Sequence, residues 1–198
     1  MQRSTMPLSL NCYNSVFRLK IWKILKKISL LTAVLFCTYC EDKNPVTDGT
    51  LAEVINAYRV EKGLKEIPVS PSLTTVAEAH VKDLSENHPN TGSCNLHSWS
   101  DKGNWTACCY TDDHANASCS WSKPRELTKY EGNGYEIAAW LSNGITAGQA
   151  LEMWKNSEGH HNVILNRGVW DDAVWNAMGA AIYNGYAVVW FGQESDNQ

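Results

Sequence analysis

Residues 154–165 read WKNSEGHHNVIL, and this stretch decides how the rest of the sequence is interpreted. Trp154 and Ser157 are three residues apart, a spacing that places both side chains on one face of a helix. The Gly159-His160 step is then expected to end that helix and to leave an imidazole at its end. The stretch therefore supplies one ionisable group to a polar site.

Two further polar groups lie upstream, His97 in the segment 95–98 and Glu136 after a glycine and a tyrosine. Two imidazoles and a carboxylate are suitable ligands for Zn²⁺ or a similar divalent ion. With His97, His160 and Glu136 as protein ligands, an open position could hold a water that attacks an ester or a peptide. Glu158 is the candidate base for that water. Alternatively, the two histidines only hydrogen-bond the carboxylate and connect the helices to a sheet.

The composition favours one domain that does not bind nucleic acid. The chain has 198 residues, of which 43% are hydrophobic, enough for a single well-packed core. Its net charge is −4, but residues 1–40 carry six basic and no acidic residues. The remainder is therefore strongly acidic and would repel phosphate, which excludes nucleic acid as an expected partner.

The first 40 residues resemble an export leader. Basic residues precede the apolar run 28–37, which is the order found in a signal peptide. The run is short for a membrane span, which needs about 20 residues. We therefore predict an export signal or lipoprotein leader at 1–40 and a polar linker at 41–47. An uncleaved anchor and a buried amphipathic helix are the alternatives.

Cys40 begins the polar stretch and is a candidate lipoprotein cysteine, although the preceding Cys37-Thr38-Tyr39 fits a lipobox poorly. The expected location is extracellular or, in a bacterium, at the membrane as an anchored lipoprotein. Membrane contact is expected only through the leader or a lipid.

The cysteines of the body indicate disulfides. Cys94, Cys108, Cys109 and Cys119 form an even set, for which three pairings exist. Adjacent cysteines rarely bridge each other, so Cys108 and Cys109 should each pair with Cys94 or Cys119, in an order that the sequence leaves open. The alternative is a zinc site that uses a nearby histidine, but the paired C-x₂-C spacing is missing.

The disulfides would staple a segment at 94–130 that shows no regular periodicity. Long irregular segments in compact domains are usually functional or cross-linked. The segment contains four aromatic residues: Trp99, Trp105, Tyr110 and Trp121. They could form an exposed ligand-binding patch or the small core that the segment needs around its disulfides, and we favour the core.

Local signals predict the elements on either side of that segment. A helix is expected from about residue 51, capped by Thr47 or Asp48, to Gly63. Ser70-Pro71 predicts a second helix start, and His80 falls on the apolar stripe of that helix, where a hydrogen-bonded histidine at the edge of the core is expected. Residues 146–149 form a capping box. Asn184-Gly185 joins the strands expected at 175–183 and 186–191 into a hairpin, which indicates an α+β fold.

With these residues in view, the body resembles the CAP superfamily, the SCP-like family of cysteine-rich secretory, antigen-five and pathogenesis-related proteins. The resemblance covers about residues 48–193, and we assign 48–198 to the domain. Several short motifs appear in family order: Asn56-Ala57-Tyr58-Arg59, Gly63-Leu64, Leu73, Ala77, Ala79, His97-Ser98, Gly134-Tyr135-Glu136, Trp154 with Ser157, Gly159-His160, Gly179 and Val189-Trp190-Phe191.

The resemblance implies a three-layer α-β-α sandwich with a central antiparallel sheet. It also implies a cavity lined by two histidines and acidic residues, here His97, His160 and Glu136. Ser157 stands where many members have a second acid. The implied function is an exported binding protein that takes a small hydrophobic ligand, a glycan or a partner protein. A metal-assisted protease or esterase that uses His97, His160 and Glu136 is the alternative, and enzyme activity is left open.

Overall fold

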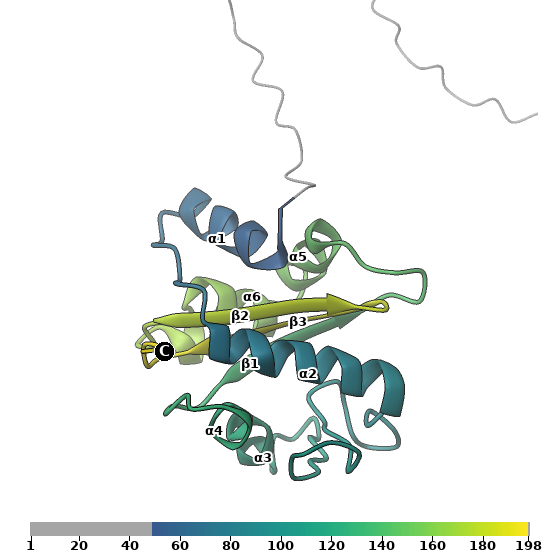
Figure 1. Ribbon diagram of the computed structural model, residues 1–198. Helices are drawn as coiled ribbons and strands as arrows, with labels where there is room; N and C mark the ends of the chain where they lie inside the picture. The colour runs from purple at the N-terminus through teal and green to yellow at the C-terminus, as the bar shows by residue number, and fades with distance from the viewer. Residues whose placement is uncertain (1–48, 198) are drawn as a thin grey trace, which may run out of the picture. The chain divides into compact units, whose positions relative to one another are not determined.

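The computed structural model describes residues 49–197, in which helices cover both faces of a three-stranded antiparallel sheet (Figure 1). The strands are β1 (Tyr135–Trp140), β2 (Ala177–Tyr183) and β3 (Tyr186–Gly192), in the order β1-β3-β2. This arrangement confirms the predicted α+β sandwich. The predicted leader and linker lie outside the described residues. Within 49–197, no helix is both long and apolar enough to cross a membrane.

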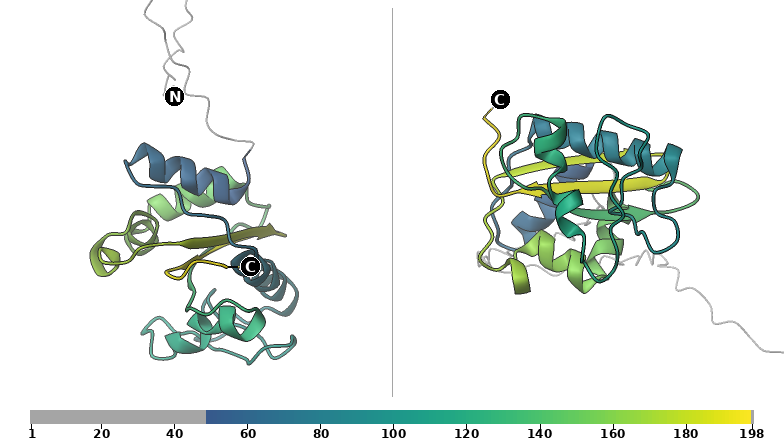
Figure 2. Two further views of the ribbon diagram at one scale, coloured as in Figure 1. Left: turned by 60° about the vertical axis from the view of Figure 1, so that its left-hand side comes forward. Right: turned by 90° about the horizontal axis from the view of Figure 1, so that it is seen from below.

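One face of the sheet is covered by α1, α5 and α6, and the other by α2 with the segment that contains α3 and α4 (Figure 2). Successive side chains along each strand point to opposite faces of the sheet and therefore pack against different layers. Ile137 and Ala139 of β1 pack into the core on the α1 side, whereas Ala138 packs on the α2 side. Glu136 shares the parity of Ala138 and therefore points to the α2 side of the sheet.

Helix α1 (Leu51–Glu61) begins at the predicted residue, but a different residue caps it. The N-cap is Thr50, whose side chain accepts from the backbone of Glu53 while the Glu53 carboxylate accepts from the Thr50 backbone. The prediction of Thr47 or Asp48 as the cap is therefore wrong, because this reciprocal pair satisfies two backbone donors at once. Gly63 follows the helix end with φ +79°, as predicted.

Helix α2 (Pro71–Asn87) starts as the sequence predicts, with Ser70 as its cap. The Ser70 hydroxyl accepts from the backbone of Leu73 at 2.9 Å. The helix lies along β2 and β3 (Figure 1), and its approach to Gly179 of β2 is so close that a side chain there would meet the backbone of Leu73.

Two helices, not one, contain the stretch at 154–165. Helix α5 (Ala147–Lys155) follows the predicted capping box of Thr146, and α6 (Glu158–Leu165) follows Ser157 as its cap residue. The prediction that Gly159-His160 ends a helix is therefore wrong: both residues lie in the first turn of α6. The chain turns at 156–157, and the one-turn helix η1 (Gly168–Trp170) follows α6.

The segment at 94–130 contains two disulfides and two short helices, α3 (Ala117–Trp121) and α4 (Lys123–Leu127). Cys94 pairs with Cys109 and Cys108 pairs with Cys119, which confirms the prediction for the adjacent cysteines and supplies their order. Four aromatic side chains of this segment are buried or half-buried against the core on the α2 side of the sheet: Trp99, Trp105, Tyr110 and Trp121. They therefore form the small core of the segment, and the alternative of an exposed patch is wrong.

The terminal hairpin has the predicted turn. Asn184 and Gly185 both have positive φ, 46° and 87°, as a two-residue hairpin turn with right-handed twist requires. β3 is thereby placed between β2 and β1, and β1 becomes an edge strand of the sheet. Because β1 is an edge strand, side chains from both helical layers can meet beside it.

Candidate functional site

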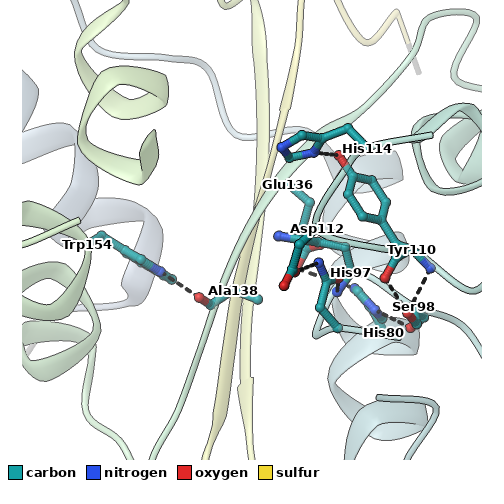
Figure 3. A network of polar contacts seen from close by, with 10 residues as sticks. His80, His97, Ser98, Tyr110, Asp112, His114, Glu136, Ala138 and Trp154 are labelled. Atoms are coloured by element: carbon teal, nitrogen blue, oxygen red, sulfur yellow. Dashed lines mark hydrogen bonds and ion pairs between the residues drawn. The ribbon is translucent and has the colours of Figure 1, made fainter. Parts of the chain in front are cut away.

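Glu136 is the centre of the polar cluster. It lies near the start of β1, opposite Trp190 of β3, and its side chain is only 2% exposed. Its Oε2 accepts a hydrogen bond from Nδ1 of His97 at 2.6 Å, a short contact (Figure 3). The structure thus brings together the carboxylate and the first histidine that the sequence selected.

The disulfide-linked segment 94–130 holds His97 in place. The His97 backbone donates to the side chain of Asn95, and the Asn95 backbone donates to the carbonyl of Tyr110 at 2.8 Å. The ring of Tyr110 packs 5.0 Å from the His97 ring, measured between centroids. Ser98 does not form a catalytic pair with His97, because its buried hydroxyl accepts from the Tyr110 backbone at 2.9 Å.

His160 reaches the cluster from the opposite layer. It is the third residue of α6, and its ring centroid lies 6.5 Å from that of His97. Because α6 covers one face of the sheet and Glu136 points to the other, the two histidines meet at the edge strand β1. Ser157, the cap residue of α6, is half-buried, and Glu158 is exposed in the first turn of that helix.

A third histidine, which the sequence motifs do not assign to the site, belongs to the cluster. His80 of α2 is fully buried, its Nε2 lies 3.1 Å from the Ser98 carbonyl, and its Nδ1 lies 3.5 Å from Oε1 of Glu136. The prediction of a hydrogen-bonded histidine is confirmed. Its place on an otherwise apolar helical stripe was the one sequence signal that could have indicated a polar partner across the core.

The three histidines experience different electrostatic environments. Burial lowers the pKa of His97, but the charge and the hydrogen bond of Glu136 outweigh it and leave the pKa above its ordinary value. Burial, and then the charge of His97, lower the pKa of His160. Burial also lowers the pKa of His80, with Glu136 acting in the opposite direction. His97 is therefore the histidine of this cluster that most readily carries a charge.

Removal of the Glu136 carboxylate should reverse the direction of the pKa shift of His97. In Glu136→Gln, burial remains and the opposing charge is lost, so we expect the pKa of His97 to fall below its ordinary value of about 6.5. The measurement is an NMR titration of the imidazole resonances in metal-free buffer. An unchanged pKa of His97 would contradict the assigned pair.

The same shift predicts the sign of a pH effect on stability. Because the folded-state pKa of His97 is raised, its pairing with Glu136 stabilises the fold below about pH 6.5, and this contribution is lost as the pH rises through the folded-state pKa. Glu136→Gln should remove this contribution. Urea unfolding of the wild type and the variant across this pH range would detect the difference.

The candidate metal ligands do not form a ready three-ligand site. In the described part of the chain, no group of three or more histidine, cysteine, aspartate or glutamate side chains is arranged to hold a metal ion. Both oxygens of Glu136 face imidazole nitrogens, so the carboxylate orients the histidines. His97 and His160 are the two residues that could still ligate an ion.

The remaining histidines have local partners. His161 is half-buried and its Nε2 lies 2.8 Å from the Tyr58 hydroxyl, which connects α6 to α1. His88 and His114 are exposed, and Nδ1 of His114 lies 2.9 Å from the hydroxyl of Tyr110.

A pocket of 660 Å³ lies away from the polar cluster, between α1 and α5. Its lining comes from these two helices and from the residues just before α5, and includes none of the cluster's histidines. Its walls are mainly apolar, with side chains such as Val54, Ala57, Leu151 and Met153. The sequence motifs predict a binding cavity at the histidines, whereas this groove is a separate feature of the structure.

Residues 52–186 match the model of the cysteine-rich secretory protein (CAP) family. Because the match covers more than half of the chain, the protein belongs to this family, and the resemblance inferred from the short motifs is confirmed. No curated protein matches the chain.

One solved structure supports the same fold. An extracellular protein containing an SCP domain from Bacillus anthracis str. Ames is similar at 19% identity and a TM-score of 0.51, over 73% of this chain and 39% of that one. A cysteine-rich secretory protein from Staphylococcus aureus subsp. aureus Mu50 matches at 17% identity and a TM-score of 0.46, over 73% and 37%. The chain spans less than half of either protein, and the first similarity shows the fold alone.

Proposed function

We propose that the protein is an exported CAP-domain binding protein that holds a small hydrophobic ligand in the groove between α1 and α5. The observation that supports this function is the groove itself. Its volume of 660 Å³ lies within the range of about 300–1,000 Å³ that is usual for small-molecule sites. Such sites combine apolar walls with a few polar groups. Here the polar lining residues are Tyr58, Glu61, Thr146, Gln149, Glu152 and Lys155, and most of the surface inside the groove is apolar.

One wall of the groove is suited to ligands of different shape. Met153 is 38% exposed although it is a large apolar side chain, and it lies in the groove lining. Methionine is flexible and polarisable, so it packs against irregular apolar surfaces. A hydrophobic ligand would cover this side chain and remove apolar surface from water, at about 25 cal/mol per Å².

Filling the groove should abolish binding. Ala57 is exposed on α1 and lines the groove, so Ala57→Trp would place a large ring where the ligand lies. With a dansyl-labelled undecanoic acid as the probe, we expect saturable fluorescence binding to the wild type and at least a tenfold weaker affinity, about 1.4 kcal/mol, in the variant.

Val60→Trp is the matched control. Val60 is 52% exposed on the same helix and is not part of the groove lining, so this variant should bind the probe like the wild type. Equal binding by both variants, or binding that never saturates, would contradict the proposal. Binding to a glycan array without binding of the probe would favour the glycan alternative.

The polar cluster supports a second proposal, a divalent cation held by His97 and His160. The supporting observation is the 2.6 Å hydrogen bond from His97 Nδ1 to Glu136. Metal-binding histidines commonly donate their second ring nitrogen to a carboxylate, which fixes the tautomer and directs the other nitrogen to the ion. Solvent ligands would complete the coordination sphere. A bound ion of this kind would supply Lewis-acid chemistry.

Zinc titration by calorimetry tests this second proposal. We expect stoichiometric Zn²⁺ binding in the wild type, loss of binding in His160→Ala, and retention in His88→Asn, which changes an exposed histidine with positive φ to another residue that tolerates this conformation. Binding that persists in His160→Ala would exclude this site.

Turnover of a peptide and ester panel by the zinc-loaded wild type would instead favour the hydrolase alternative. The structure supports that alternative less, because Ser157 replaces a second acid and Glu158 is exposed in the first turn of α6.

Export is proposed from the basic and apolar start of the sequence and is consistent with the two disulfides, which form in oxidising compartments. The similar Bacillus anthracis protein is described as extracellular. Mass spectrometry of the mature N-terminus distinguishes a cleaved signal, a lipidated Cys40 and a retained leader. An intact leader on protein that stays inside the cell would overturn the proposal.

A further inference from the structure

We propose that His80 is a positioning residue of the polar cluster, which holds the second oxygen of Glu136 and thereby fixes the orientation of His97. The inference deepens the proposed cation site and rests on it for its functional meaning. Its structural basis, the contacts of His80 with Ser98 and Glu136, does not depend on any bound ion.

The His80 ring is held in place by two tryptophans. It stacks on Trp99 with 4.2 Å between centroids and an interplanar angle of 7°, and it meets Trp190 edge-on at 5.8 Å. Trp99 belongs to the disulfide-linked segment, and Trp190 is the cross-strand partner of Glu136. The imidazole is therefore packed between the two parts of the chain that carry His97 and Glu136, and it is fully buried.

Both nitrogens of this ring face oxygen atoms that can only accept. Nε2 donates to the carbonyl of Ser98 at 3.1 Å, and Ser98 directly follows His97 in the chain. Nδ1 points at Oε1 of Glu136 at 3.5 Å (Figure 3). At 3.5 Å this second contact is longer than an ordinary hydrogen bond, and it joins two buried polar atoms, Nδ1 of His80 and Oε1 of Glu136. Neither atom has a hydrogen-bond partner among the described residues, so each is placed beside the polar group that best compensates its burial.

The consequence is a fixed carboxylate. With Oε1 directed at His80, Oε2 is left to accept from His97 at 2.6 Å. A carboxylate held at one oxygen only could rotate and pair with His97 less well, because the last torsion angle of a glutamate side chain has a broad range of allowed values. His80 thus acts on His97 through Glu136, and its contact with the Ser98 carbonyl fixes the backbone beside His97.

Two matched substitutions separate this role from packing. In His80→Asn the amide nitrogen can take the place of Nδ1 and donate to Glu136, whereas in His80→Gln it takes the place of Nε2 and donates to Ser98. In ¹⁵N NMR spectra of the metal-free protein, we expect the strongly downfield Nδ1–H signal of His97 in the wild type. It should persist in His80→Asn and shift upfield, with faster solvent exchange, in His80→Gln.

Zinc affinity gives the second readout. We expect His80→Gln to weaken Zn²⁺ binding about tenfold, the lower end of the effect of residues that orient metal ligands, and His80→Asn to weaken it less. His80→Phe, which retains a ring for stacking on Trp99 but has no donor, should behave like His80→Gln and provides a folded alternative if the amide variants unfold.

The outcome that overturns the proposal is a His97 signal that is unchanged in both His80→Gln and His80→Phe, because Glu136 would then be held by His97 alone. This result is distinct from failure of the cation site. If the wild type binds no Zn²⁺ but its His97 signal responds to His80 substitutions as expected, the positioning role stands and the metal function is wrong.

Discussion

Gly179→Ala should destabilise the domain by about 3 kcal/mol or more, at or above the upper end of the usual cost of overpacking a core. A Cβ atom at this position would lie 2.0 Å from the backbone carbonyl carbon of Leu73 and 2.2 Å from the backbone nitrogen of Thr74. These are backbone atoms of α2, so no side chain can rotate away, and the whole helix must move from the sheet. Urea unfolding followed by tryptophan fluorescence measures the change.

Gly159→Ala is the control for this prediction. Gly159 lies in α6, is exposed, and has no atom within 4 Å of an added Cβ. Alanine favours a helix over glycine by up to about 1 kcal/mol, so this variant should be as stable as the wild type or slightly more stable. If both alanine variants unfolded at the same urea concentration as the wild type, the close packing of α2 on β2 would be wrong.

Removal of the Cys94–Cys109 disulfide should cost about 3 kcal/mol, the loss expected from a cross-link that spans 15 residues. The double variant Cys94→Ser, Cys109→Ser keeps the other disulfide and makes the segment around His97 more mobile. Because Cys94 lies three residues before His97, we expect the Nδ1–H signal of His97 to weaken together with the loss of stability. Urea unfolding and NMR of the same sample measure both effects.

The other disulfide serves as the comparison. Cys108–Cys119 spans 11 residues and connects to α3, farther along the chain from His97. Its removal should reduce stability by a similar amount, about 3 kcal/mol, but should affect the His97 signal less. Equal loss of the His97 signal in both double variants would show that the cross-links act only through overall stability.

Local signals predicted the elements that depend on neighbouring residues. The cap at Ser70, the capping box of Thr146 and the turn at Asn184-Gly185 are all confirmed, because each is satisfied by hydrogen bonds or dihedral angles within four residues. The cap of α1 was assigned to the wrong residue because several residues before the helix can act as caps. The true cap also requires Glu53 three residues later.

The helical stretch at 154–165 shows where such signals fail. Glycine followed by histidine is typical of a helix end, but here both residues lie in the first turn of α6, after a break at 156–157. The break lets Trp154 stay buried with its indole nitrogen donating to the carbonyl of Ala138, while His160 turns toward β1. The packing of α5 and α6 against β1 determines the position of this break. The helix propensities of the residues in the stretch do not predict it.

The sequence by itself determined the family motifs, the hairpin, the set of cysteines that must pair, and the two histidines and the glutamate of the cluster. Only the tertiary structure decided the order of the disulfides, the place of His80 beside Glu136, the meeting of His97 with His160 at an edge strand, and the groove between α1 and α5. The physical reason is range: caps and turns are stabilised by atoms a few residues apart, whereas the site is assembled by core packing that joins residues from 80 to 160.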